Sequence, residues 1–455
     1  MKTTPNTISD PYHASGAWGD TTLDMLFRQT AAEHPDRLAL SDAPDRASWT
    51  GGESRTLSYA EADKEVDRLA AFYKAVGLAT DHVIGIQAPN TVDTVIAFLA
   101  ALRAGLIVSP LPLHWRQKNV LDALNSIGAK GFIAADRIET RRVGETARDV
   151  AANLFSLRFV FGLGSDIPDG LIDLGPMLAE MGEELAFEET ERSQASDQTA
   201  TISWSRSSDE TVPVSRCHNH WLASARQCID EAGLEQGQKF LIPYSLSGLT
   251  GLGAGLVPWL MTGGSLHLHH PTSLHQLSRH ANEISANYIL TPGPLTQLLD
   301  QSLKNDDVTI VSAWNISAPH PATYVAKHKV IDLHIADEFA LVAKARGPSA
   351  KVQEVPLGKQ TGSNGRESGP ALLEIAVSEE EDGKPVTLRV KGPSVPEFGW
   401  RGGQQTKAPQ RDADGFVNTS VPVEQTDAGL TGFGIPGLQG NGTGDIKGLD
   451  DLYVR

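Results

Sequence analysis

Histidine is the chemistry-bearing residue type most concentrated in one stretch of this sequence. Five of them fall within fourteen residues: His267, His269, His270, His275 and His280. Imidazole nitrogens bind zinc and other transition metals, and alternate strand residues such as His267 and His269 share a face. No cysteine lies close by in sequence, and the nearest carboxylate is Glu283. We therefore favour a surface corner between a strand and a helix over a metal site.

A cysteine flanked by histidines is the second candidate for chemistry. Cys217 lies beside His218 and His220, and a thiol becomes a nucleophile when an imidazole takes its proton. Cys217 and Cys228 are the only two cysteines in the 455 residues. This number excludes a disulfide framework and a four-cysteine zinc site, and it fits a reducing cytoplasm.

The elements that would position these residues alternate between strand and helix. In the first third of the chain, hydrophobic spacing predicts helices over residues 60–76 and 91–104 and strands over 83–86 and 107–110. Strand, helix and strand at this spacing indicate βαβ units and a mostly parallel sheet. The predicted fold class is therefore α/β.

Composition divides the chain into four parts. The βα alternation predicts two lobes, about 20–165 and 199–345, joined by an acidic, loop-like stretch over 161–198. Residues 346–430 read as a small β-rich subdomain resembling a barrel, and 431–455 as a glycine-rich tail.

Charge and hydropathy narrow the class of protein. There are 39 basic and 56 acidic residues, a formal charge of −17, so the chain lacks the basic surface that nucleic acids and anionic membranes require. No apolar run reaches the roughly 20 residues of a membrane span, and residues 1–19 do not resemble a signal peptide. We expect a cytoplasmic protein.

The order of several short segments resembles the large N-terminal domain of the adenylate-forming superfamily, which includes acyl-CoA synthetases and peptide-synthetase adenylation domains. Coverage runs from about residue 21 to 430. The segments are Leu57-Ser58-Tyr59-Ala60-Glu61, Ala88-Pro89-Asn90, Ala104-Gly105, Leu111-Pro112-Leu113, Pro243-Tyr244, Gly263-Gly264, Ser317-Ala318-Pro319 and Lys391-Gly392-Pro393-Ser394. The resemblance implies that a carboxylate attacks ATP to form an acyl-adenylate, and that a thiol such as coenzyme A then takes the acyl group.

The phosphate loop of that superfamily is rich in glycine and threonine and carries a lysine. Aligned on Pro213, this chain has carboxylates at Asp209 and Glu210 and an apolar Val214 in place of the lysine. At ~5 Å and an effective dielectric constant of about 20, each carboxylate would repel a phosphate charge by roughly 3 kcal/mol. A shifted alignment would let Arg206 or Arg216 supply charge but would restore no glycine. The loop remnant is Ser207, Ser208, Asp209, Glu210, Thr211 and Val214.

The other nucleotide motifs are also incomplete. Glu338 is retained where the superfamily holds magnesium, so it is the one candidate magnesium ligand, and Val421 stands where a ribose-binding aspartate is expected. An aliphatic side chain accepts no hydrogen bond from a ribose hydroxyl. The predicted remnant of the nucleotide pocket is Ser317, Ala318, Pro319, His334, Asp337, Glu338 and Val421.

The superfamily's C-terminal lid is the fourth element that the resemblance implies. Its hinge contains an arginine, but Gly434-Ile435-Pro436-Gly437 has none, and the sequence ends at Arg455. We expect the lid lysine to be lost, or supplied by another polypeptide.

Taken together, these motifs predict an acyl-CoA-synthetase-like protein that has lost ATP-dependent adenylation, needs no cofactor and keeps a ligand-binding or regulatory role. A small acyl or carboxylate ligand, and a synthetase, lid-domain or acyl-carrier partner, would fit this role. The alternative is an active carboxylate-CoA ligase that uses magnesium, ATP, coenzyme A and a separate lid. A third is an acyltransferase that uses pre-formed thioesters. The predicted acyl pocket is Trp204, Tyr244, Ser245, Leu246, Gly248 and Leu249.

Overall fold

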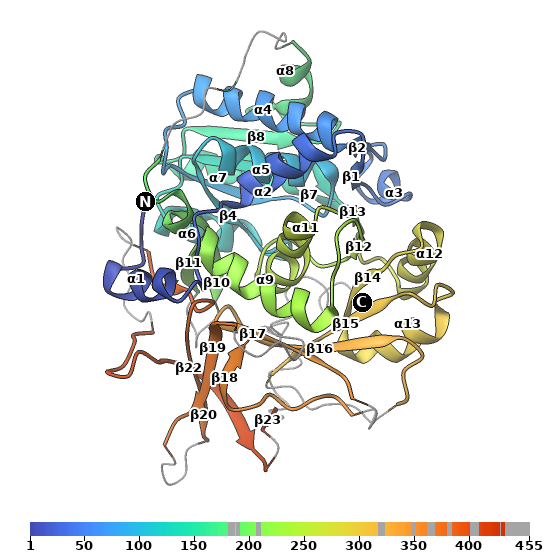
Figure 1. Ribbon diagram of the computed structural model, residues 1–455. Coiled ribbons are helices and arrows are strands. Elements are labelled where there is room, and N and C mark those ends of the chain that lie inside the picture. The colour runs from blue at the N-terminus through green and yellow to red at the C-terminus, as the bar shows by residue number, and fades with distance from the viewer. Residues whose placement is uncertain are drawn as a thin grey trace.

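Three sheets organise the computed structural model (Figure 1). The structure describes residues 1–432 except 181–186, 188–191, 206–210, 317–323, 348–350, 362–368, 380–384, 401–408 and 428. Within this part of the chain are two eight-stranded sheets, a five-stranded sheet and the short hairpin of β6 (Arg137–Ile138) and β7 (Arg141–Arg142). No helix in the described part is long and apolar enough to cross a bilayer.

The first eight-stranded sheet contains the predicted βαβ units. Its central strands run parallel, and its helices begin with the capping residues that the sequence suggests: Ser58 caps α4 by accepting from the Glu61 amide (3.3 Å). In sheet order the strands are β21 (Glu397–Phe398), β11 (Val212–Cys217), β10 (Thr199–Ser205), β4 (Ile107–Pro110), β3 (Val83–Gln87), β5 (Gly131–Ala135), β8 (Phe159–Leu163) and β9 (Ile172–Asp173). The accompanying helices are α4 (Tyr59–Ala75), α5 (Val92–Arg103), α6 (Gln117–Ser126), α7 (Val143–Asn153) and α8 (Leu174–Glu180).

The second eight-stranded sheet is also mainly parallel, with antiparallel strands at both edges. Its order is β17 (Ala340–Ala345), β16 (Lys329–Ala336), β15 (Thr309–Asn315), β14 (Tyr288–Pro292), β12 (Lys239–Ile242), β13 (Ser265–Leu268), β1 (Leu38–Ser41) and β2 (Thr56–Ser58). The helices of this half are α9 (His218–Ala232), α10 (Leu249–Gly251), α11 (Val257–Thr262), α12 (Leu274–Ile284) and α13 (Thr296–Ser302), with short 3₁₀ or π turns at Ala195–Asp197, Leu252–Leu256 and Gly293–Leu295.

The third sheet is antiparallel and forms the lower part of the molecule in Figure 1. Its order is β18 (Gly358–Thr361), β19 (Ala371–Val377), β20 (Thr387–Lys391), β22 (Val417–Gln425) and β23 (Leu430–Gly432). A bridge between Val355 and Leu430 brings the two edges together. This arrangement agrees with the β-rich subdomain expected from the sequence.

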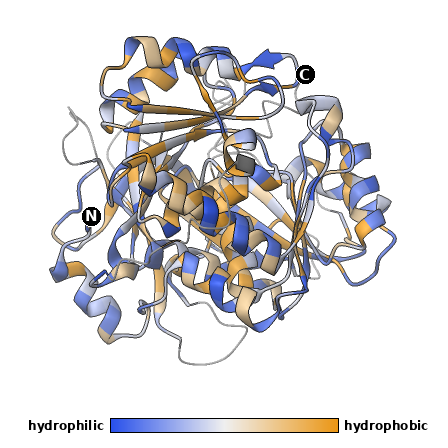
Figure 2. Ribbon diagram, turned by 90° about the horizontal axis from the view of Figure 1, so that it is seen from above, coloured by the Kyte–Doolittle hydropathy of each residue, from blue (hydrophilic) through white to orange (hydrophobic). Residues whose placement is uncertain are grey.

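Helices from both halves pack between the two large sheets. The first three helices of the chain are α1 (Asn6–Ala14), α2 (Leu23–Glu33) and α3 (Arg46–Thr50). Helices α2, α4, α5, α9 and α11 contact one another and share one apolar core. Hydrophobic residues are correspondingly frequent in the middle of the molecule in Figure 2.

The structure differs from the sequence-based organisation in two places. Strands β10 and β11 pair with the first sheet, while β1 and β2 pair with the second, so each large sheet takes strands from both predicted lobes. The stretch 161–198, expected to be loop-like, contains the end of β8 together with β9 and α8. The glycines and acidic residues of this stretch favoured a loop, so these short elements were not predicted from the sequence.

Candidate functional site

The Glu338 carboxylate lies at the turn after β16 and is almost completely buried, with 2% of the residue exposed. Its Oε2 accepts hydrogen bonds from Ser203 Oγ (2.7 Å) and Arg216 Nη1 (2.9 Å). Its Oε1 accepts from the Leu249 backbone amide (3.0 Å). Each carboxylate oxygen therefore has a protein donor.

Arg216 provides the charge that balances this carboxylate. It lies in β11, is fully buried, and also donates to Ser203 Oγ (2.8 Å) and to the Glu338 carbonyl. Its guanidinium lies 4.8 Å from the centre of the Trp221 ring. Burial lowers the pKa of Arg216, and the nearby Glu338 carboxylate opposes that shift.

Gly248 makes the close approach to Glu338 possible. A Cβ at this position would lie 2.7 Å from Glu338 Oε1, which is closer than real Cβ contacts. The glycine thus allows the carboxylate to reach the Leu249 amide at the start of α10.

A second carboxylate follows the same strand. Asp337 has a positive φ of 46° and accepts a hydrogen bond from Ser205 Oγ, so β10 contributes hydroxyls to both acidic residues. The structure therefore brings together Ser203 and Ser205 of β10, Arg216 of β11, and the acidic pair after β16.

The segment that leads to Gly248 is joined to the other half of the molecule. Asn90, between β3 and α5, donates through Nδ2 to the carbonyls of Ile242 (3.2 Å), Tyr244 (2.7 Å) and His269 (3.3 Å). Tyr244, Ser245, Leu246, Gly248 and Leu249 were predicted to line an acyl pocket. The four with side chains are all at most 7% exposed, and Ser245 Oγ donates to Ser247 Oγ (3.0 Å).

The remaining predicted residues are more dispersed. Trp204 is buried in β10 and donates to Ser109 Oγ (3.1 Å), and His334 is buried in β16. Val214 is buried in β11, Thr211 is exposed just before this strand, and Val421 packs on the apolar core of the small subdomain. Seven predicted residues lie outside the described part of the chain: Ser207, Ser208, Asp209, Glu210, Ser317, Ala318 and Pro319.

Arg216 and Ser203 are the site residues that sequence reasoning underrated. Arg216 entered only as a possible source of charge in a shifted phosphate loop, to which Ser203 would supply a hydroxyl. The available signal was an arginine among small and apolar residues in Val212–Cys217, because a charged residue in a buried strand requires a partner of opposite charge.

Four of the five clustered histidines are not at the surface, so for them that expectation was wrong, whereas His275 is exposed. His267, His269, His270 and His280 are each at most 5% exposed, because β13 and α12 pack their corner inward. His269 Nδ1 and His280 Nδ1 are 3.2 Å apart, and burial lowers the pKa of His269 to about 3 and of His280 to about 4. The described residues contain no group of three or more His, Cys, Asp or Glu that could hold a metal ion.

Cys217 and His220 do form a pair, with 3.1 Å between Sγ and Nδ1. Both side chains are fully buried, and burial raises the pKa of Cys217 to about 12 while lowering the pKa of His220 well below its usual value. A thiol held in its neutral form is a poor nucleophile. These residues act as structural groups at the start of α9.

The two mainly parallel sheets and the helices that pack between them define an α/β class of protein. A family model described as "AMP-binding enzyme" matches residues 27–321, more than half of the chain, and the chain belongs to this family of adenylate-forming ligases.

Individual relatives are similar over shorter stretches. The salicyl-AMP ligase / salicyl-S-ArCP synthetase of Mycobacterium tuberculosis is 36% identical over 169 residues, which are 37% of this chain and 27% of the relative. The medium-chain fatty-acid–CoA ligase of Escherichia coli is 27% identical over 261 residues, 56% of this chain and 44% of the relative. The chain thus matches less than half the length of these curated relatives.

Solved structures support the same fold. The apo structure of Mycobacterium smegmatis MbtA has a TM-score of 0.71 to this chain at 18% identity, covering 95% of this chain and 79% of that one. At this identity, the similarity concerns the fold alone.

Proposed function

We propose that this chain is a member of the AMP-binding enzyme family that binds a ligand or a partner but does not carry out ATP-dependent adenylation. The observation that carries the proposal is the Arg216–Glu338 pair. The residue that the resemblance assigns to magnesium is already neutralised by an internal cation.

A magnesium ion does not fit beside this pair. Magnesium is usually held by one or two carboxylates and several waters, whereas three of the roughly four lone-pair positions of Glu338 already accept protein hydrogen bonds in a buried site. At 4 Å and an effective dielectric constant of about 20, each pair of like unit charges costs about 4 kcal/mol, so a divalent ion next to Arg216 is strongly disfavoured.

Two apolar replacements support the same conclusion. Val214, which stands in place of the phosphate-binding lysine, is fully buried, and Val421, in place of the ribose-binding aspartate, packs on the apolar core of the small subdomain. Neither side chain offers a charge or a hydrogen bond to a nucleotide.

Calorimetric titration with Mg-ATP tests the proposal, and the Mycobacterium tuberculosis salicyl-AMP ligase serves as a matched positive control. We expect no binding at millimolar nucleotide. A dissociation constant below ~0.1 mM, about −5.5 kcal/mol, would contradict the proposed loss of nucleotide binding. Carboxylate-dependent exchange of pyrophosphate into ATP would contradict the loss of adenylation.

A second candidate is an active acid–thiol ligase. The similarity to a salicyl-AMP ligase and to a fatty-acid–CoA ligase favours it. On this reading magnesium, ATP and coenzyme A are needed, and a lid domain or an acyl-carrier protein acts as partner. The pyrophosphate-exchange assay separates the two candidates, because only the active ligase should show carboxylate-dependent exchange.

A further inference from the structure

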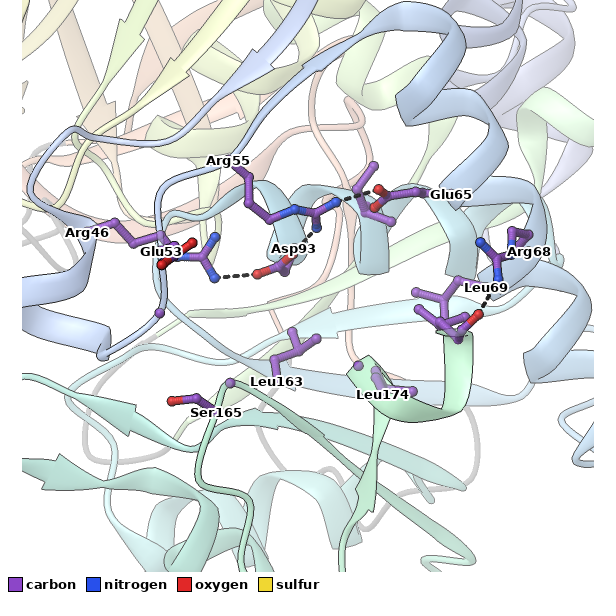
Figure 3. A pocket seen from close by; sticks show the side chains of 15 residues that line it. Arg46, Glu53, Arg55, Glu65, Arg68, Leu69, Asp93, Leu163, Ser165 and Leu174 are labelled. Atoms are coloured by element: carbon purple, nitrogen blue, oxygen red, sulfur yellow. Dashed lines mark hydrogen bonds and ion pairs between the residues drawn. The ribbon is translucent and has the colours of Figure 1, made fainter. Parts of the chain in front are cut away.

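A cavity of about 500 Å³ lies beside α4, α5 and α8, away from Glu338 (Figure 3). None of its lining residues belongs to the Arg216–Glu338 site, so the cavity is a separate feature. Its volume is within the range of small-molecule sites. Five aliphatic side chains from four elements form one wall: Leu69 of α4, Ile96 of α5, Leu163 of β8, and Leu174 and Leu178 of α8.

This aliphatic wall is part of the main apolar core. Leu69, Ile96 and Leu174 are at most 3% exposed and are members of the core. Leu163 and Leu178 are half-buried and pack against it. Because core side chains are closely packed, the wall is formed before any ligand arrives, and a molecule that covers it removes apolar surface from water.

The charged wall of the cavity is a row of ion pairs. Asp93, in the first turn of α5, is bridged by Arg46 and Arg55, and Arg55 also pairs with Glu65. Figure 3 shows these four side chains in one row, above Leu163 and Leu174. Positive and negative groups therefore alternate along this wall.

The alternating charges favour an uncharged ligand. With Arg68 and Glu53 included, the lining contains three arginines and three acidic residues. Arg68 also donates to the Leu178 carbonyl. A carboxylate or an ammonium group placed against the row would meet charges of both signs, so net attraction would not offset its lost hydration.

We propose that this cavity binds a small, uncharged molecule whose body is mainly apolar. The body lies against the aliphatic wall, and the burial of apolar surface provides the driving force, so affinity rises with the length of an alkyl chain until the cavity is full. The ion pairs of the charged wall stay intact in the complex. This site does not depend on the function proposed for the Arg216–Glu338 region.

The first test locates the bound molecule, with octanamide as the probe. Leu178→Trp and Leu163→Trp each place a large ring at the half-buried part of the wall, from α8 and from β8, and should abolish octanamide binding measured by calorimetry. Leu298→Trp is the matched control, because Leu298 is 55% exposed on α13 and does not line the cavity.

The control should bind octanamide like the unmodified protein. Circular dichroism shows which variants are folded, and each folded cavity variant decides the outcome. Octanamide binding that is retained in a folded cavity variant, or lost equally in the control, would place the molecule elsewhere and overturn the proposal. The absence of saturable octanamide binding to the unmodified protein would overturn it as well.

The second test compares ligand charge at constant chain length. Octanamide, octanoate and octylammonium each have eight carbons and differ in charge, and the binding assigned to the cavity is the part that Leu178→Trp removes. This part should be at least tenfold weaker for the two ions than for octanamide. From hexanamide to octanamide it should tighten about fourfold per methylene. Equal or tighter cavity binding of either ion, or an affinity independent of chain length, would overturn the proposal.

Discussion

The sealed Arg216–Glu338 site and the charged wall of the 500 Å³ cavity use the same chemistry in different surroundings. Both pair arginines with carboxylates. Arg216 and Glu338 are almost completely buried, whereas the side chains of Arg55 and Glu65 are 33% and 29% exposed. Water screens the second set and not the first. The burial of the ion pairs, more than their number, therefore decides how much each of the two regions contributes to the free energy of unfolding.

The largest expected effect comes from removing the internal cation. Arg216→Met leaves the Glu338 carboxylate buried without its charge partner, which should lower the free energy of unfolding by about 3 to 5 kcal/mol. Urea denaturation followed by circular dichroism measures this change. The double variant Arg216→Met, Glu338→Gln removes both charges and should recover most of the loss. A double variant no more stable than the single one would show that the pair's charge is not what stabilises this region.

The buried histidines should make the protein sensitive to acid. The pKa of His269 in the folded state, about 3, lies below its ordinary value of 6.5, so its stabilising effect is complete above pH 6.5 and is lost as pH falls toward 3. At pH 5 the loss should be about 2 kcal/mol for this histidine. Urea titrations of the unmodified protein and of His269→Gln, at pH 7 and pH 5, measure it. The variant should show a pH dependence smaller by that amount, and an unchanged pH dependence would contradict the assignment.

A single methyl group should disturb the sealed site more than the protein surface. Gly248→Ala brings a Cβ within 2.7 Å of Glu338 Oε1 and should push the carboxylate away from the Leu249 amide, at a cost of about 1 to 3 kcal/mol. Gly19→Ala is the control, because no atom lies within 4 Å of its added Cβ. We expect the control to change unfolding free energy by less than about 0.5 kcal/mol. Equal effects of the two substitutions would remove the argument for close packing at Gly248.

The smallest expected effect concerns the half-exposed cavity wall. Glu65→Gln removes one partner of Arg55, which keeps Asp93, and should lower the free energy of unfolding by only about 0.2 to 1 kcal/mol. Added salt should reduce the difference further, because exposed pairs are screened. Urea denaturation at low and high salt gives both values. A loss as large as that of Arg216→Met would mean that exposure does not separate the two regions.

Local sequence patterns predicted single elements well. The expected strand 107–110 is β4, and the helix expected over 60–76 is α4, because hydrophobic spacing and caps act within a few residues. The pairing of β1 with β13 joins residues more than 200 positions apart, and no local period encodes it. The resemblance to the adenylate-forming superfamily singled out Glu338, but not its partner. Arg216 meets Glu338 only through the packing of β11 against the turn after β16.

The Asn90 amide has a consequence for how the two large sheets can move. A side-chain amide nitrogen has two hydrogens, yet Nδ2 of Asn90 lies within 3.3 Å of three carbonyls, at the end of β12 and just after β12 and β13. The donors are therefore shared, and one acceptor can be exchanged for another without leaving a hydrogen unpaired. A small displacement of one sheet edge along the other would therefore change which carbonyl accepts from Asn90, while the number of hydrogen bonds would stay the same.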